Sequence, residues 1–324
     1  MGKRRLRNFL KLGLDDIIGF DTKKDRLIES KRKYHISTTD NFNEAIKSNP
    51  DLIIISTPPD NHLKFVKIAI KHKIPFFTEL NLLSQHVKKI QKLSTEKNTI
   101  GFPSCTMKFH PLVKELKKII DRNTVGKILF VRHHSGQYLP YWHPWEDYKN
   151  FFVSKKETGG ARELVPIELM WLIDLFGEID SVFSDVQKIS SLDVKIDDSY
   201  QIILNFKNGV KANLSIDVFS IPPRRESVII GETGTILCDF TTGKIKISKG
   251  NKWLSHKIKF GKRAHGYSKN TPSEFIYEEE TKSIIETLTK NKKYPYTYLE
   301  EFKILKILDS IEKSSELGKR IKIY

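Results

Sequence analysis

Histidines and large aromatic side chains are concentrated in residues 133–148, which read HHSGQYLPYWHPWEDY. The stretch holds three of the ten histidines, two of the four tryptophans and three tyrosines. Rings with polar tips suit stacking on sugar faces and hydrogen bonding to hydroxyl groups, and histidine transfers protons near neutral pH. We therefore predict that this stretch binds a hydroxylated substrate. The alternative is an aromatic loop packed on a sheet, which its prolines and charged neighbours disfavour.

Within this stretch we predict His143 as an acid–base residue, with His134 and Tyr141 as rivals of suitable chemistry. His133 and His134 are adjacent on a predicted strand, so their side chains point to opposite faces and only one can face a site. The aromatic residues predicted to contact substrate are Tyr141, Trp142 and Trp145.

Strand and helix patterns alternate with short connections through the first third of the chain. Apolar runs predict buried strands at 15–21, 51–57, 74–79 and 99–104. Amphipathic or capped segments predict helices at 2–12, 41–49, 60–73 and 84–97. This alternation is typical of a parallel, doubly wound sheet, so we predict an α/β domain here.

From about residue 127 the pattern changes to strands separated by turn signals such as KNG, GETG and TTG. Strands are predicted at 127–137, 179–189, 199–207, 210–219, 226–231, 234–239 and 243–248. With a helix near 162–176, they predict an α+β domain with a mostly antiparallel sheet. We predict two domains, 1–106 and 107–324, and expect that the closing helices within 272–318 can pack back on the first.

Composition excludes several classes of protein. The 324 residues are 39% hydrophobic and 29% charged, and no apolar run approaches the ~18–20 residues of a membrane span. Cys105 and Cys238 lack metal-ligand spacing and favour a reducing compartment, so we expect a cytoplasmic protein without a metal. The net charge of +17 is spread along the chain without a nucleic-acid-binding motif. We therefore expect no nucleic-acid or membrane partner.

Several segments, in order, resemble the glucose–fructose oxidoreductase / inositol dehydrogenase (Gfo/Idh/MocA) family. DLIIISTPPDNHLKFVKIAIKHKIPFFTE is similar to the family's strand, Thr-Pro-x-x-x-His turn, helix and next strand. MKFHP is similar to its Arg-Phe-x-Pro stretch, and TGGARELVPIELMWLIDLFGEI to its Gly-Gly…Asp-x-x-x-His helix. The closing NKKYPYTYLEEFKILKILDSIEKSSELGKRIKI is similar to its last helix and strand. The resemblance implies a Rossmann-like domain, NAD-dependent oxidation of a sugar or sugar nucleotide, and a homo-oligomer formed through the second-domain sheet.

The spacing at the amino end fits this resemblance. Asp21 lies 19 residues after Gly2, close to the distance between the third glycine of a G-x-G-x-x-G motif and the acidic residue that binds ribose. Gly2 thus takes the place of the third glycine, and the first strand and first two glycines are missing. We expect a start placed too late rather than a true truncation, and we expect unpaired apolar strand edges. Asp21 favours NAD because a carboxylate repels a 2′-phosphate, whereas Lys23 and Lys24 leave NADP possible.

The resemblance also implies cofactor-binding residues. His62 is expected to support the cofactor turn rather than to carry a proton. The full set of implied cofactor-binding residues is Gly2, Asp21, Ser56, Thr57, Pro58, His62 and Glu79.

The family's catalytic pattern is altered. Leu80 stands at the position of its lysine and Ile167 at that of its histidine, whereas Glu163 falls at the position of its aspartate. We predict Glu163 as a catalytic residue, with helix capping as the alternative. A catalytically defective sugar- or nucleotide-binding homologue is the rival function.

Two cations are predicted substrate contacts. Lys108 falls at the family's Arg position, and Arg162 can bind a carboxylate or phosphate or form a structural ion pair. Pro166 predicts a helix start nearer residue 164, which would move Glu168 toward the family's His position.

Overall fold

The computed structural model describes residues 1–143, 146–259 and 274–323, and the chain divides into two compact units. The first unit comprises Met1–Asn81, Gln85–Ser104 and Tyr277–Glu301. The second comprises Leu82–Ser84, Cys105–Ile276 and Phe302–Tyr324. Residues near the carboxyl end therefore belong to both units. Trp145, one of the predicted substrate contacts, lies outside the described residues.

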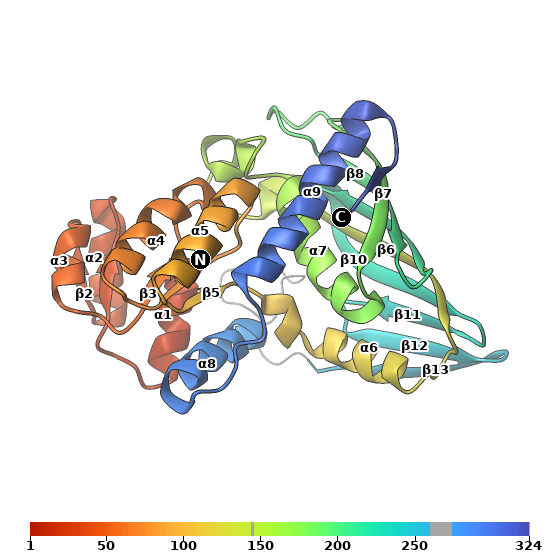
Figure 1. The fold of residues 1–324 in the computed structure, drawn as a ribbon, viewed down its shortest axis with the longest axis horizontal. Helices are drawn as coiled ribbons and strands as arrows, with labels where there is room; N and C mark the ends of the chain where they lie inside the picture. The colour runs from red at the N-terminus through yellow and green to blue at the C-terminus, as the bar shows by residue number, and fades with distance from the viewer. Residues whose placement is uncertain (144–145, 260–273, 324) are drawn as a thin grey trace. The chain divides into compact units, whose positions relative to one another are not determined.

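The first unit is built from short parallel strands and the helices that connect them (Figure 1). Its strands are β1 (Ile18–Phe20), β2 (Ser37–Thr39), β3 (Ile53–Ile55), β4 (Phe76–Thr78) and β5 (Gly101–Pro103). Its helices are α1 (Gly2–Lys11), α2 (Lys24–Tyr34), α3 (Phe42–Lys47), α4 (His62–Lys71), α5 (Ser84–Glu96) and α8 (Glu274–Lys290). The sequence patterns did not predict α2 or β2, because the helix buries no side chain and the strand has only three residues.

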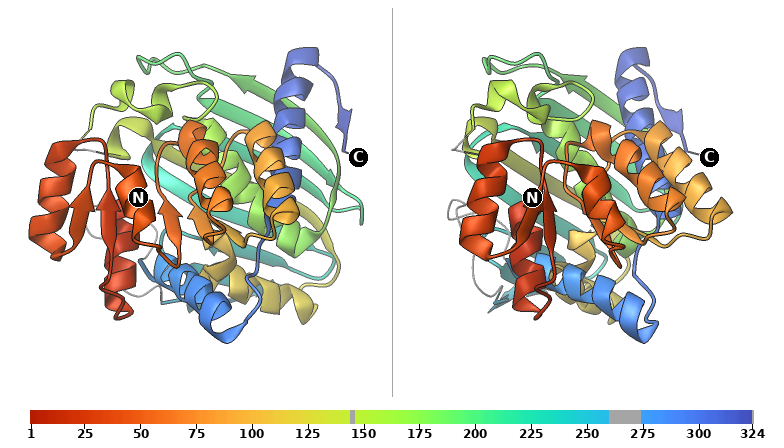
Figure 2. Two further views of the ribbon diagram at one scale, coloured as in Figure 1. Left: turned by 60° about the vertical axis from the view of Figure 1, so that its left-hand side comes forward. Right: turned by 90° about the vertical axis from the view of Figure 1, so that its left-hand side faces the viewer.

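These parallel strands form two sheets rather than one. One sheet has the order β1-β2 and the other the order β3-β4-β5 (Figure 2). Within the described chain, neither β1 nor β3 pairs with a strand on its other side. A cluster of Phe20, Phe42 and Phe65, with ring centroids 4.9–5.9 Å apart, connects β1 to α3 and α4. Side-chain packing therefore joins the β1 region to α4, and backbone pairing does not.

The second unit contains a sheet of nine strands in the order β13-β12-β11-β10-β6-β9-β8-β7-β14. Among the described strands of this sheet only β6 and β9 pair in parallel, so the predicted mostly antiparallel sheet is confirmed. The strands are β6 (Ile128–Tyr138), β7 (Ile179–Gln187), β8 (Ser199–Phe206), β9 (Lys211–Asp217), β10 (Phe219–Gly231), β11 (Thr235–Asp239), β12 (Lys244–Lys249), β13 (Lys252–Lys257) and β14 (Ile321–Lys322).

Helices α6 (Pro111–Asp121), α7 (Ala161–Phe176) and most of α9 (Tyr298–Leu317) lie along one face of this sheet (Figure 1). The fully buried Val131, Trp171 and Leu308 belong to the core between helices and sheet. On the other face, Phe183 and Ile203 are paired neighbours and about two fifths exposed. The described residues of this unit place no helix on that face (Figure 1).

Helix α7 begins at Ala161, so the predicted start near residue 164 is wrong. Pro166 lies inside the helix, where its missing N–H leaves the Arg162 carbonyl without the usual partner. Gly160 caps the helix at φ +63°, a conformation that favours glycine, and a Cβ on Gly159 would lie 2.1 Å from the Val153 carbonyl oxygen. The two glycines before α7 therefore allow a close backbone crossing that sets the helix start. No helix in the described part of the chain is both long and apolar enough to cross a membrane.

Candidate functional site

In the first unit, polar residues gather where the parallel strands end. Ser56 follows β3 and donates a hydrogen bond from Oγ to Glu79 Oε1, 3.2 Å away, just after β4. A Cβ on Gly2, the first residue of α1, would lie 3.8 Å from the Ser56 Cβ. The structure thus brings together three of the predicted cofactor residues at the edge where open parallel sheets bind ligands.

A buried arginine that the sequence patterns did not single out holds this edge together. Arg5 donates to both oxygens of Glu79 at 2.7 and 2.8 Å, and its Nη1 lies 2.6 Å from Glu280 Oε2. Burial alone would raise the pKa of Glu79, but the Arg5 guanidinium lowers it below its usual range. Glu79 is therefore a carboxylate. Its partner lies 74 residues away in sequence, too far for any local spacing rule to identify.

His62 supports the turn after β3. Its Nε2 lies 2.8 Å from the Thr57 carbonyl oxygen, and its Nδ1 lies 2.8 Å from Asn81 Oδ1. Burial lowers the pKa of His62, so the ring is neutral near pH 7. Pro58 precedes the short 3-10 helix Pro59–Asn61 that leads into α4. These contacts suit the structural role expected for His62.

Asp21 stands at the end of β1, in the other sheet of this unit. Its Oδ1 accepts a hydrogen bond from the Lys23 backbone N–H at 2.9 Å, and its Oδ2 lies 3.7 Å from Arg26 Nη1. The carboxylate is one third exposed, so a ribose could reach it. Arg26 places a positive charge beside Asp21, which would attract a 2′-phosphate.

The residues of the first unit fit part of a dinucleotide. Thr57 Oγ1 is buried and has no hydrogen-bond partner within the described residues, so it is available to a ligand at the strand ends. Asp21 offers acceptors for ribose hydroxyls, and the amino end of α1 begins at Gly2, close to Ser56. These groups would hold the ribose and phosphate portions.

In the second unit, Glu163 occupies the first turn of α7. Its Oε2 is buried without a hydrogen-bond partner in the described chain, and burial raises its pKa to about 8. A carboxyl group with such a pKa can both give and take a proton near neutral pH. The capping alternative is disfavoured because burial keeps the group neutral, and a neutral carboxyl loses the charge that interacts with the helix dipole.

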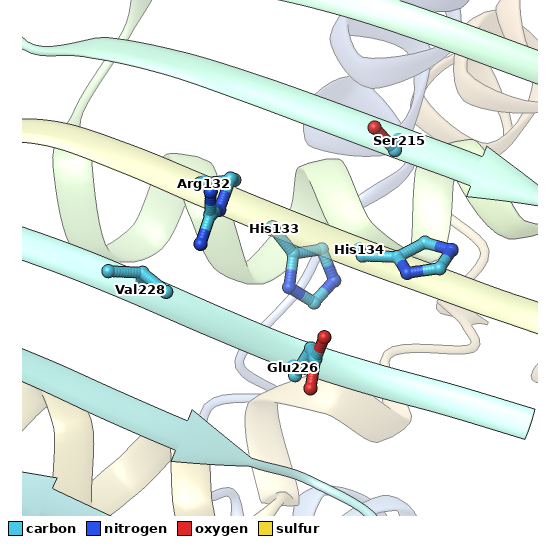
Figure 3. Close-up of a pocket in the computed structure, with 6 residues that line it drawn as sticks. All are labelled: Arg132, His133, His134, Ser215, Glu226 and Val228. Carbon is cyan, nitrogen blue, oxygen red and sulfur yellow. The ribbon is translucent and has the colours of Figure 1, made fainter.

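His133 and His134 point to opposite faces of β6, as the alternation predicts. His133 faces α7 and is buried, whereas His134 lies on the opposite face and contacts Asp217 Oδ2 at 2.7 Å. A depression of about 300 Å³ beside His134 is lined by Arg132, His133, His134, Ser215, Glu226 and Val228 (Figure 3). His134 and Glu163, two of the predicted acid–base residues, thus lie on opposite sides of this sheet, and the structure does not bring them together.

The other aromatic candidates lie in the segment that follows β6. Tyr141 is more than half exposed, and its ring meets the Tyr138 ring edge-on at 4.8 Å. Trp142 Nε1 is buried and lacks a hydrogen-bond partner within the described residues. The His143 ring contacts Phe151 at 5.1 Å. Trp142 therefore keeps a polar atom available beside its rings, as sugar binding requires.

The two predicted cationic contacts are engaged by protein groups. Arg162 donates to Glu312 Oε1 at 2.6 Å and to the backbone oxygens of Leu82 and Glu157. This arrangement favours its alternative role as a structural ion pair. Lys108 Nζ lies 2.6 Å from Asp174 Oδ2 on α7. A substrate anion would therefore have to compete with a carboxylate for Lys108.

Glu168 belongs to a buried cluster between α7 and the nine-stranded sheet. Its oxygens contact His133 Nε2 at 2.9 Å, Trp171 Nε1 at 2.7 Å and Arg225 Nη2 at 2.9 Å. Burial alone would raise the pKa of Glu168, but Arg225 and His133 lower it well below its usual range. The suggested shift of Glu168 into a catalytic position is thus not supported.

Comparisons with known proteins agree with this fold. Residues 113–237 match the family model described as the GFO/IDH/MocA C-terminal domain. Oxidoreductase P35 of Formosa agariphila is 21% identical over 232 residues, which cover 70% of this chain and 71% of that protein.

Solved structures extend the likeness to the whole fold. An oxidoreductase from Agrobacterium radiobacter, crystallised with NAD+, L-tartaric acid and magnesium, matches with a TM-score of 0.84 and 13% identity, over 99% of this chain and 94% of that one. Levoglucosan dehydrogenase in complex with NADH matches with a TM-score of 0.83 and 14% identity, over 100% and 96%. The fold is thus that of Gfo/Idh/MocA-type oxidoreductases, and the resemblance read from the motifs is confirmed.

Proposed function

We propose that this protein is an NAD-dependent oxidoreductase that acts on an alcohol group of a sugar or sugar nucleotide. The observation that carries this proposal is Glu163, whose Oε2 is buried without a partner in the described chain and whose pKa is raised by burial to about 8. The similar solved structures include levoglucosan dehydrogenase with NADH and with levoglucosan, which supports a sugar-type alcohol.

The first unit is proposed to hold the cofactor. Asp21 would accept hydrogen bonds from the ribose hydroxyls, and the Thr57 turn and the start of α1 would contact the phosphate portion. NAD, when bound, supplies the hydride acceptor. NADP remains a second candidate because Lys23 and Arg26 flank Asp21.

The second unit is proposed to bind the sugar and move the proton. Tyr141, Trp142 and His143 would contact the ring and hydroxyl groups, and Glu163 would take the hydroxyl proton on its carboxylate during oxidation. Glu163 would thereby replace the family's lysine and histidine, whose positions hold Leu80 and Ile167. A role in carbohydrate metabolism, such as that of surface glycans, and a cytoplasmic location are parts of the same proposal.

A catalytically defective sugar- or nucleotide-binding homologue is the second candidate. The specific observation in its favour is that Leu80 and Ile167 can neither give nor take a proton. In that case the chain would bind nucleotide or sugar without turnover.

The uncovered face of the nine-stranded sheet is proposed to pair two copies of the chain. Phe183, Ile203 and Ile230 are each about two fifths exposed on this face, where solvent exposure of large apolar side chains is unfavourable. Sedimentation of the purified protein tests whether it is a dimer or a larger oligomer.

The function is tested by reduction of NAD+ with a panel of pyranoses that includes levoglucosan, in the wild type and in Glu163→Gln. We expect wild-type oxidation to increase as the pH rises through about 8, because Glu163 must be ionised to accept a proton. Glu163→Gln should lower kcat about 100-fold or more and abolish this pH dependence.

The matched control is Glu178→Gln. This substitution alters an exposed carboxylate that follows the end of α7 and pairs with Lys207. It should leave kcat unchanged. Turnover in Glu163→Gln at the wild-type rate would refute the role of Glu163. Binding of NADH or sugar without any turnover in the wild type would instead support the defective homologue.

A further inference from the structure

A buried chain of hydrogen-bonding groups connects the Thr57 turn to the first turn of α9. At one end, His62 lies between the Thr57 carbonyl and the carboxamide of Asn81. At the other end, the same carboxamide lies 2.8 Å from Thr78 Oγ1 and 3.0 Å from Glu301 Oε2. His62, Thr78, Asn81 and Glu301 are each at most 2% exposed, so bulk water does not reach these groups.

The hydrogen-bond donors among these groups can be assigned by starting from the Thr57 carbonyl. The Thr57 carbonyl oxygen can only accept, so His62 Nε2 must carry the hydrogen. In a neutral imidazole the other nitrogen, Nδ1, is then an acceptor. Asn81 must therefore present its amide N–H to His62 Nδ1. A carboxamide has the same shape after half a turn, so this orientation requires no movement of neighbouring atoms.

The same orientation directs the Asn81 oxygen toward Thr78 and Glu301. The Thr78 hydroxyl can rotate to donate to it, and can then accept from the Tyr298 hydroxyl, 2.9 Å away. Glu301 Oε2 can donate only if it carries a proton. Its other oxygen, Oε1, still accepts from the Asn81 backbone N–H at 3.3 Å. Each of these hydrogen-bonding groups then has a partner, and none of them is charged.

The opposite orientation requires a buried imidazolium. With the Asn81 oxygen facing His62, both ring nitrogens must donate, so His62 is charged, and that charge is balanced only if Glu301 accepts from the carboxamide as a carboxylate. Two charges taken out of water and held apart by an amide are unfavourable. The carboxylates of Asp60 and Glu79 favour the imidazolium, and the amino end of α9 favours the carboxylate. Burial outweighs the two carboxylates at His62, whose pKa is lowered, and it raises the pKa of Glu301 to about 8.

We propose that Glu301 is a positioning residue which, in its protonated form, turns the Asn81 carboxamide and thereby holds His62 as the neutral Nε2–H tautomer that fixes the Thr57 carbonyl. That this turn holds a nucleotide rests on the proposed function, whereas the proton assignment does not. Loss of the Glu301 proton favours the reversed carboxamide, which sets the Asn81 oxygen against His62 Nδ1. The Thr57 turn therefore loosens as the pH rises through about 8.

The proton assignment is tested by nitrogen-15 NMR of the histidine rings in the full chain, with His62→Gln to identify the His62 signals. At pH 7 we expect His62 to show a protonated Nε2 and an unprotonated Nδ1. Glu301→Gln should preserve this pattern and remove its pH dependence, because a glutamine amide can donate as the acid does and cannot ionise. Asn81→Asp should convert His62 to the imidazolium, because a carboxylate cannot donate to Nδ1.

Doubly protonated His62 in the wild type at pH 7, or a changed His62 signal in Glu301→Gln, would overturn the assignment. Both of these readings stand even if Asn81→Asp fails to fold.

The positioning role is tested by calorimetric titration of NADH into the same proteins. We expect Glu301→Gln to bind NADH within twofold of the wild type, and Asn81→Asp to bind it more than tenfold more weakly. The control is Asn205→Asp, which alters a buried asparagine of the second unit that contacts Ser181 and should not change NADH affinity.

Unchanged NADH affinity in Asn81→Asp, with His62 converted to the imidazolium, would refute the positioning role. Absence of NADH binding in the wild type would instead refute the proposed cofactor, while the NMR result would still decide the proton assignment.

Discussion

The two units place their buried charges at different points of their sheets. In the first unit, Arg5 and Glu79 meet where short parallel strands end. In the second, Glu168, His133 and Arg225 meet beneath the middle of long strands that continue on both sides. A ligand can approach strand ends, whereas the middle of a covered sheet is closed to it. A carboxylate paired with an arginine therefore lies at a ligand-accessible edge in the first unit, whereas in the second unit it stabilises the core.

The largest effect is expected for Glu168→Ala in the second unit. The substitution leaves the Arg225 guanidinium without its carboxylate and removes an acceptor from both His133 and Trp171. We expect a loss of about 3–5 kcal/mol in the free energy of unfolding, measured by urea denaturation. Glu178→Ala, which removes an exposed carboxylate, is the control. A loss below about 1 kcal/mol for Glu168→Ala would show that the cluster is not what holds α7 to the sheet.

A somewhat smaller loss is expected for Arg5→Met in the first unit, about 3 kcal/mol at pH 8. Glu79 and Glu280 then lose their cation, but they can take up protons as the pH falls. In the wild type, the lowered pKa of Glu79 contributes stability above its usual titration range, and this is lost as the pH falls through its folded-state pKa. In Arg5→Met the sign reverses, so the variant should be more stable at pH 5 than at pH 8.

Arg5→Met should also weaken NADH binding if the strand ends hold the nucleotide, whereas Glu168→Ala should not do so in its folded fraction. Calorimetry at a temperature where both variants are folded distinguishes the two. If both substitutions changed NADH affinity equally, the Arg5 cluster would have no greater part in nucleotide binding than the Glu168 cluster.

The smallest effect on stability is expected for Ile203→Lys on the uncovered face of the nine-stranded sheet. This exposed side chain contributes little to the fold, so the free energy of unfolding should change by less than about 0.5 kcal/mol. Sedimentation should nevertheless show dissociation of the proposed oligomer. Ile28→Lys, which alters an exposed isoleucine on α2, is the matched control and should leave the oligomer intact. An intact oligomer in Ile203→Lys would exclude this face as the interface.

Local patterns predicted most of the fold. The apolar run Ile53–Ile55 and the helical spacing of apolar residues in α4 each indicate which side chains are buried. Both patterns extend over only a few neighbouring residues, so they can be recognised in the sequence. The polar helix α2 and the three-residue β2 have no such signature and were not predicted. The start of α7 was misplaced because Pro166 is tolerated inside a helix whose other contacts stabilise it.

The candidate site was only partly predictable for a related reason. The spacing of Gly2 and Asp21, the Thr57–His62 turn and the aromatic segment after β6 are contiguous in sequence, so the patterns could identify them. The charged or titratable partners Glu79 of Arg5, Glu301 of Asn81 and His133 of Glu168 are 74, 220 and 35 residues away, so no local pattern could reveal them.

By itself the sequence determined which residue types are available and which helices and strands they form, because these depend on short-range periodicity and backbone preference. Tertiary structure alone decided which carboxyl groups are charged. Glu79 and Glu168 pair with arginines and stay ionised, whereas at Glu163 and Glu301 burial outweighs the weaker favourable interactions and raises the pKa values to about 8. The physical reason is that a pKa depends on the distance to distant charges and on exclusion of water, and only the folded chain sets both.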